Sequence, residues 1–224
     1  MEITWYGGSC FRLRDRNTIA LADPYLPDPR FQNLQIKTDL ATFSRPGLPL
    51  RTIVPNIRKT VFEVTRPGEY EVGGIFVSTF PSGTGVNGTE DAASVLVSLF
   101  VLDGTSVCHL GQLEEPLSGE LAERLTPLDV LLIPHGGRGK LSKSAASDLV
   151  SALEPGVVIP MGYAGEAPED TEKGISEFLE ELGLPGPEPV AVLNVSRSSL
   201  PENRTEVMLL ESRSKEKKPA ASKN

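Results

Sequence analysis

The chain has 224 residues, of which 39% are hydrophobic and 23% are charged, so it is long enough to bury a sizeable core. No apolar run approaches the ~18 residues that a membrane-spanning helix needs, and the first residues do not resemble a signal peptide. The formal net charge of −8 argues against non-specific nucleic-acid binding. These features predict a cytoplasmic protein without membrane contact.

Short strands are predicted throughout the first half of the chain. Apolar runs rich in Val, Ile, Phe and Thr alternate there with turn residues, which is typical of half-buried strands. Asp23-Pro24 ends the third run, because proline fixes its own φ and disfavours helix at the residue before it. The predicted strands cover residues 2–6, 10–14, 18–22, 39–44, 61–64, 70–80, 94–102 and 105–109.

The second half changes to a helical period. Helices are predicted at 117–125 with Ser118 as N-cap, at 142–153 with a serine cap and an end before Pro155, and at 170–182 ending at Gly183. Apolar strands at 129–134 and 156–160 separate them, and two closing strands follow at 190–195 and 206–210. Helices packed outside two sheets form a four-layer αββα sandwich of the α/β (α+β) class.

The C-terminal tail differs in composition from the rest. Residues 212–224 carry five basic side chains against one acidic side chain and few apolar ones, which predicts disorder. We therefore divide the chain into one domain, 1–211, and a basic tail, 212–224. The tail is either a solubilising extension or a docking segment for an acidic partner.

Cys10 and Cys108 are far apart in sequence and each lies in an apolar stretch. They are interpreted as small buried hydrophobes, with a disulfide or a reactive thiol as the alternative. On a strand, Cys108 and His109 point to opposite faces, so this neighbouring pair does not form a nucleophile and base.

Several segments agree, in order, with one known family. They include WYGGSCF at 5–11, ADPY at 22–25, RPGEYEVGGIFV at 66–77, DVLLIP at 129–134 and VIPM at 158–161. The chain resembles the metallo-β-lactamase-fold superfamily, and within it the small bacterial members similar to ascorbate-phosphate lactonase. The resemblance implies the αββα sandwich, a hydrolase-like scaffold and a homo-oligomer.

The same resemblance assigns the family's metal ligands to positions that lack suitable side chains here. Arg45, Gly47, Pro49 and Leu50 stand where three histidines and an aspartate are expected, Gln112 replaces the bridging aspartate, and Gly162 replaces the last histidine. Arginine stays protonated and does not ligate zinc, while proline and leucine offer no donor. The chain has only two histidines. We therefore expect no metal and no other cofactor.

Five residues remain as candidates for the cleft: Ser9, Asp23, His109, His135 and Tyr163. Asp23 matches a family aspartate that orders the loops around the metals, although capping of the turn beside Pro24 is its simpler interpretation. His109 is interpreted as a half-buried structural imidazole. His135 precedes a glycine-rich basic segment, 136–140, which forms either an anion-binding loop or a plain loop.

These observations predict a metal-free, catalytically inactive member of the fold that serves as a binding or assembly module, either as a homo-oligomer or with a protein partner. The alternative is a hydrolase of the superfamily with a non-standard site, for which His135, His109, Asp23, Cys10 or Tyr163 would have to serve. A nucleic-acid module is a third hypothesis, which the acidic body disfavours. The small-molecule ligand stays unassigned.

Overall fold

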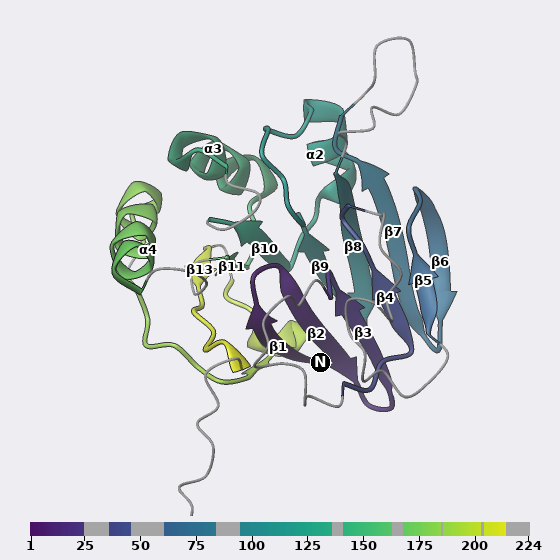
Figure 1. Ribbon diagram of the computed structural model, residues 1–224. Coiled ribbons are helices and arrows are strands. Elements are labelled where there is room, and N and C mark those ends of the chain that lie inside the picture. The colour runs from purple at the N-terminus through teal and green to yellow at the C-terminus, as the bar shows by residue number, and fades with distance from the viewer. Residues whose placement is uncertain are drawn as a thin grey trace, which may run out of the picture.

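The structure is a computed structural model that describes residues 1–24, 36–45, 61–83, 95–135, 141–162, 168–184, 186–202 and 204–213. Two sheets lie face to face in it, and helices cover the outer side of one of them (Figure 1). The predicted α/β sandwich of the metallo-β-lactamase type is therefore confirmed. Within the described residues all three α-helices pack on the same sheet, and the tail beyond residue 213 lies outside them.

The first sheet has the strand order β12-β1-β2-β3-β4-β5. The three N-terminal strands pair antiparallel through tight connections, whereas β3, β4 and β5 run parallel to one another. The strands are β1 (Glu2–Gly7), β2 (Cys10–Asp15), β3 (Thr18–Ala22), β4 (Leu40–Thr42), β5 (Phe62–Val64) and β12 (Leu193–Asn194).

The second sheet has the strand order β13-β11-β10-β9-β8-β7-β6. Its β6 to β9 strands are antiparallel, and β9, β10, β11 and β13 are parallel. The strands are β6 (Gly68–Val72), β7 (Ile75–Pro81), β8 (Leu96–Leu102), β9 (Thr105–His109), β10 (Val130–Pro134), β11 (Val157–Met161) and β13 (Glu206–Val207).

Three α-helices, α2 (Gly119–Leu125), α3 (Lys143–Leu153) and α4 (Pro168–Leu182), flank the second sheet, and a 3₁₀ turn, η2 (Arg197–Ser199), lies near the C-terminus (Figure 1). The predicted serine caps are confirmed: the Ser118 side chain accepts a hydrogen bond from the Leu121 amide at 3.3 Å and the Ser142 side chain one from the Ala145 amide at 3.2 Å. None of the described helices is long and apolar enough to span a membrane.

Alternation along the parallel strands builds two cores. In β10, Leu131 and Ile133 face the helices, while Val130 and Leu132 face the other sheet. The same alternation places Cys108 among the residues that pack against the helices. Both faces of these strands are buried, which explains why their sequences read as continuous apolar runs.

Two predictions of strand boundaries are wrong. The run at 70–80 is not one strand but the hairpin β6–β7, because Gly73 (φ +59°) and Gly74 (φ +88°) form a left-handed turn inside it. The closing strands are also shorter than predicted: β12 and β13 have two residues each, and Val190 forms only an isolated bridge with Leu210.

Gly111 lets the two sheets approach closely just beyond the end of β9. Its φ is +62°, and a Cβ atom built on it would lie 2.1 Å from the Cβ of Ser44, which follows β4. Real Cβ contacts are never this short, so a side chain here would force the ends of β4 and β9 apart. Gly104 shares the positive φ (+73°) but has no atom within 4 Å of the same position.

We expect Gly111→Ala to destabilise the protein by more than Gly104→Ala. The Gly104 variant isolates the cost of a left-handed non-glycine backbone, about 1–2 kcal/mol. The Gly111 variant adds overpacking, which costs about 1–3 kcal/mol more. Urea unfolding of both variants measures the difference, and equal losses of unfolding free energy would contradict the close approach.

Candidate functional site

Polar groups converge where several strands end at one edge of the sandwich. Asp23 follows β3, Ser44 follows β4, His109 ends β9, and Ser9 lies in the turn between β1 and β2. In α/β proteins, ligands bind beyond the carboxyl ends of parallel strands. This edge is therefore the candidate functional site.

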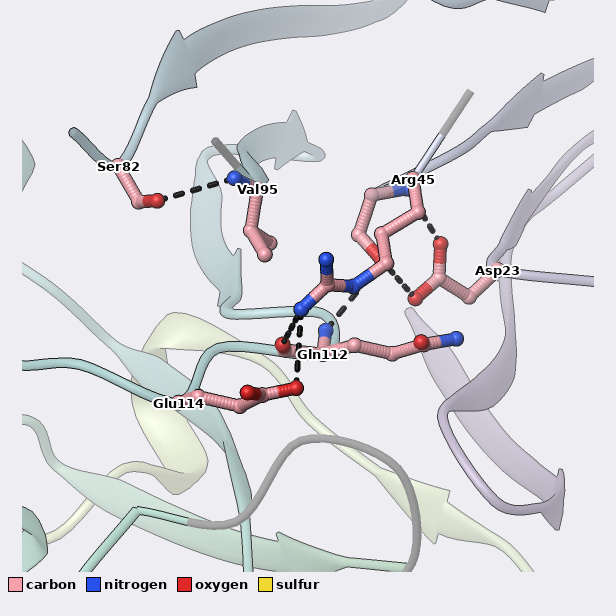
Figure 2. Close-up of polar contacts among 7 residues, drawn as sticks. Asp23, Arg45, Ser82, Val95, Gln112 and Glu114 are labelled. Carbon is pink, nitrogen blue, oxygen red and sulfur yellow. Dashed lines mark hydrogen bonds and ion pairs between the residues drawn. The ribbon is translucent and has the colours of Figure 1, made fainter. Parts of the chain in front are cut away.

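Asp23, which is labelled in Figure 2, and Ser44 form the buried centre of the site. The Asp23 carboxylate accepts one hydrogen bond from the Ser44 amide at 2.6 Å and another from the Ser44 hydroxyl at 2.5 Å. The Asp23 amide donates to the Thr42 carbonyl at 2.9 Å. Both side chains are almost completely buried. Asp23 thus bridges to a strand end 21 residues away, rather than merely capping the turn beside Pro24.

Ser44 also connects this centre to the second sheet. Its hydroxyl accepts a hydrogen bond from the Gln112 amide at 3.3 Å, and its carbonyl accepts one from the Leu96 amide at 2.8 Å. Gln112 lies shortly after β9, and Leu96 begins β8. Ser44 is therefore held by three separate segments, two of which bind its backbone.

Arg45 extends from this anchored residue across to the segment after β9 (Figure 2). Its guanidinium donates to the Gln112 carbonyl at 3.4 Å and pairs with the Glu114 carboxylate at 3.0 Å. The Arg45 side chain is 39% exposed and the Glu114 side chain 59% exposed. Unlike Asp23 and Ser44, this ion pair is in contact with solvent.

His109 holds the turn between β1 and β2. Its Nε2 lies 2.8 Å from the Ser9 carbonyl, and because a carbonyl only accepts, Nε2 carries the proton and donates it. The Gly8 carbonyl accepts bonds from the Trp5 indole at 2.9 Å and from the Gly162 amide at 3.1 Å. The turn is thus tied to the ends of β9 and β11.

Burial dominates the electrostatics of Asp23 and His109. Desolvation raises the pKa of Asp23, although the neighbouring His109 and the hydrogen bonds from Ser44 and Ser9 oppose the rise. Desolvation lowers the pKa of His109, opposed by the Asp23 charge and the bond to Ser9. The charge of each group therefore opposes the shift that burial causes in the pKa of the other.

The structure brings three of the five predicted cleft residues together: Ser9, Asp23 and His109. His109 is fully buried rather than half-buried as predicted. His135 follows β10, and its ring contacts the tilted ring of Phe178 in α4 at a centroid distance of 4.5 Å, on the helix side of the sheet. Tyr163, Gly47, Pro49, Leu50 and the segment 136–140 lie outside the described residues.

Sequence reasoning missed Ser44 and Glu114 as site residues. Ser44 was seen only as the end of a predicted strand, and Glu114 was not singled out. Their partners are 21 and 69 residues away in the chain, so no local pattern could connect them. Asp23, in contrast, had a local signal, because it stands at a strand end before proline.

Neither cysteine belongs to the reactive part of the site. Cys10 and Cys108 are both free thiols with no exposed surface. Burial raises the pKa of both thiols, which keeps them in the unreactive protonated form. The interpretation as buried hydrophobes is confirmed.

Comparison with known proteins identifies the family. A family model described as "Beta-lactamase superfamily domain" matches residues 2–162. The chain belongs to this superfamily. A solved structure from Thermotoga maritima, assigned to the Zn-dependent hydrolases of the metallo-β-lactamase superfamily, is 26% identical with a TM-score of 0.73, and the match covers 94% of this chain and 99% of that one.

Two archaeal relatives match this chain over most of its length. A UPF0173 protein of Pyrococcus furiosus is 29% identical, with 81% of this chain and 90% of the relative covered. A UPF0173 metal-dependent hydrolase of Methanopyrus kandleri is 26% identical, with 82% and 94% covered.

These relatives overturn the main functional prediction. A metal-free, catalytically inactive binding or assembly module is contradicted, because the similar protein of Methanopyrus kandleri is named a metal-dependent hydrolase and the similar structure is described as that of a Zn-dependent hydrolase. The prediction weighed the residue types that are missing and gave too little weight to the scaffold that is present. The alternative, a hydrolase of the superfamily, agrees better with the comparisons.

The described residues of this chain do not fit a metal centre like the one that those names imply. Within the described ranges no three His, Cys, Asp or Glu side chains are grouped closely enough to hold a metal ion. Both Asp23 oxygens accept hydrogen bonds from Ser44, and Nε2 of His109 is used by the Ser9 carbonyl. Asp23 and His109 therefore act in this site through hydrogen bonds.

We expect the free energy of unfolding to decrease as the pH falls, because His109 is buried in its neutral form. Its folded-state pKa is lowered below 6.5, so its contribution is present above pH 6.5 and is lost as the pH falls toward the folded pKa. The loss reaches at most about 1.4 kcal/mol per pH unit. His109→Gln keeps a donor for the Ser9 carbonyl but cannot titrate.

Unfolding free energies of the wild type and of His109→Gln, measured between pH 8 and 5, test this expectation. The wild type should lose stability relative to the variant as the pH falls. A difference that stays constant over this range would show that His109 is not buried as a neutral imidazole.

Proposed function

We propose that this protein is a hydrolase of the metallo-β-lactamase superfamily that acts at the candidate site with a non-standard set of groups. The observation that carries the proposal is the convergence of Asp23, Ser44, His109 and Ser9 at the strand ends, where they hold the surrounding segments together. The similarity to proteins named metal-dependent hydrolases supports the same reaction class.

Burial separates positioning residues from groups that can meet a substrate. Asp23 and His109 have at most 1% of their surface exposed, so a substrate does not reach them. Glu114 is exposed and Arg45 is partly exposed, and both lie beside the buried centre. The reacting groups are therefore assigned to this pair, and the residues beneath it position them.

The two side chains can divide the work of hydrolysis. The Glu114 carboxylate accepts a proton from a water molecule as the water oxygen attacks the scissile bond, and that proton then passes to the leaving group. The electron pair of the broken bond stays on the leaving group, so one water is consumed. The Arg45 guanidinium supplies positive charge next to this base.

We expect Glu114→Gln to lower kcat by about 100-fold or more, as loss of a general base does. Glu115→Gln is the matched control, because Glu115 is the next residue, is also exposed and gives the same change of charge. Hydrolysis is measured on chromogenic ester, phosphodiester and lactone substrates, each with added Zn²⁺ or Mn²⁺ and with EDTA.

The control should keep the wild-type rate. Equal rates for both variants would remove Glu114 from the mechanism. Absence of hydrolysis with every substrate, with and without metal, would argue against the proposed function itself. Thermal unfolding of each variant checks that a lost rate does not result from a lost fold.

A further inference from the structure

We infer that the substrate carries an anionic oxygen group, a phosphate or a carboxylate, which binds the guanidinium of Arg45 in place of Glu114. This inference rests on the proposed function and names its substrate class. Arg45 and Glu114 are 3.0 Å apart in the structure, so the protein's own carboxylate already occupies the position that such a group would take.

The backbone next to Arg45 is fixed by buried hydrogen bonds. Arg45 directly follows Ser44, whose amide and hydroxyl are bound by Asp23 and whose hydroxyl also accepts from the Gln112 amide. The Gln112 carbonyl accepts a further bond from the guanidinium itself at 3.4 Å. A positioned guanidinium loses less freedom when it binds an anion, because much of its ordering has already taken place.

Glu114 is a partner of Arg45 that an incoming anion can replace. Exposed ion pairs contribute little to stability, and Glu114 is the more exposed member at 59%. Guanidinium groups bind carboxylate and phosphate through parallel N–H···O bonds, which an incoming anion can also form. Displacement would release the Glu114 carboxylate, so binding of the correct substrate would free the proposed base.

The net charge of the chain influences where an anion binds on the protein. The net charge is −8 although the tail 212–224 is basic, so the rest of the chain is acidic and repels anions from most of its surface. A positioned cation next to the candidate site is then the favoured location for a substrate anion. The same acidity lowers the background against which anion binding is measured.

Titration with inorganic phosphate, followed by isothermal calorimetry at low ionic strength, tests the inference without any turnover. The variants are Arg45→Gln, Arg45→Lys and Glu114→Gln in the full chain. Arg204→Gln is the matched control, because Arg204 forms an exposed ion pair with Glu206 at 2.5 Å in another part of the fold. A parallel titration with acetate distinguishes phosphate from carboxylate.

We expect Arg45→Gln to weaken phosphate binding at least about tenfold and Glu114→Gln to strengthen it by about three- to tenfold, because an internal competitor is removed. Arg45→Lys should fall between the wild type and Arg45→Gln, since it keeps the charge but loses the planar donor geometry. Arg204→Gln should bind as the wild type does. Stronger binding of phosphate than of acetate would identify a phosphate group, and the reverse a carboxylate.

The inference is overturned if Arg45→Gln binds phosphate as well as Arg204→Gln does, or if Glu114→Gln leaves the affinity unchanged. This failure is distinct from failure of the proposed function. Hydrolysis of an ester that carries a phosphate or carboxylate group, with an unchanged KM in Arg45→Gln, would keep the hydrolase and remove the anion anchor. Phosphate binding at Arg45 without hydrolysis of any substrate would keep the anchor and remove the hydrolase.

Discussion

The hydrogen bonds between Asp23 and Ser44 are the interaction on which the site depends. They join the ends of two parallel strands, and Ser44 then binds backbone groups of Leu96 and Gln112 in the other sheet. One buried carboxylate therefore sets the relative position of both sheets at this edge. Its desolvation is unfavourable, as the raised pKa of Asp23 indicates, and is offset by short hydrogen bonds and by the nearby His109.

This arrangement separates rigidity from reactivity. Asp23, Ser44 and His109 are buried and have their hydrogen bonds satisfied within the protein, so they fix geometry. Arg45 is next to Ser44 in the chain, and its starting direction is therefore set by a bond that solvent does not reach. Reacting groups held by such a buried layer need little reorganisation when a substrate binds. The exposed pair can change chemically without disturbing the layer beneath it.

Most of the fold could be predicted from the sequence because its signals are local. Serine caps at Ser118 and Ser142, continuous apolar runs and helical periodicity each act over a few residues. The failures have equally local causes. The Gly73-Gly74 turn lies inside one apolar run and was read as part of a strand. The closing strands β12 and β13 are short because they pair only at sheet edges, which depends on residues far away in the chain.

The site was harder to predict because its contacts join distant residues. Asp23 could be found from its position before proline. Ser44 and Glu114 could not, because folding brings them to their partners from distant parts of the chain. The small number of histidines bears only on metal binding. The prediction of an inactive protein was wrong because it treated the loss of metal ligands as the loss of all catalytic chemistry. A scaffold keeps strand ends together whatever side chains they carry. A charged side chain at that edge is well placed when its backbone is anchored. Arg45 is such a residue because it directly follows Ser44.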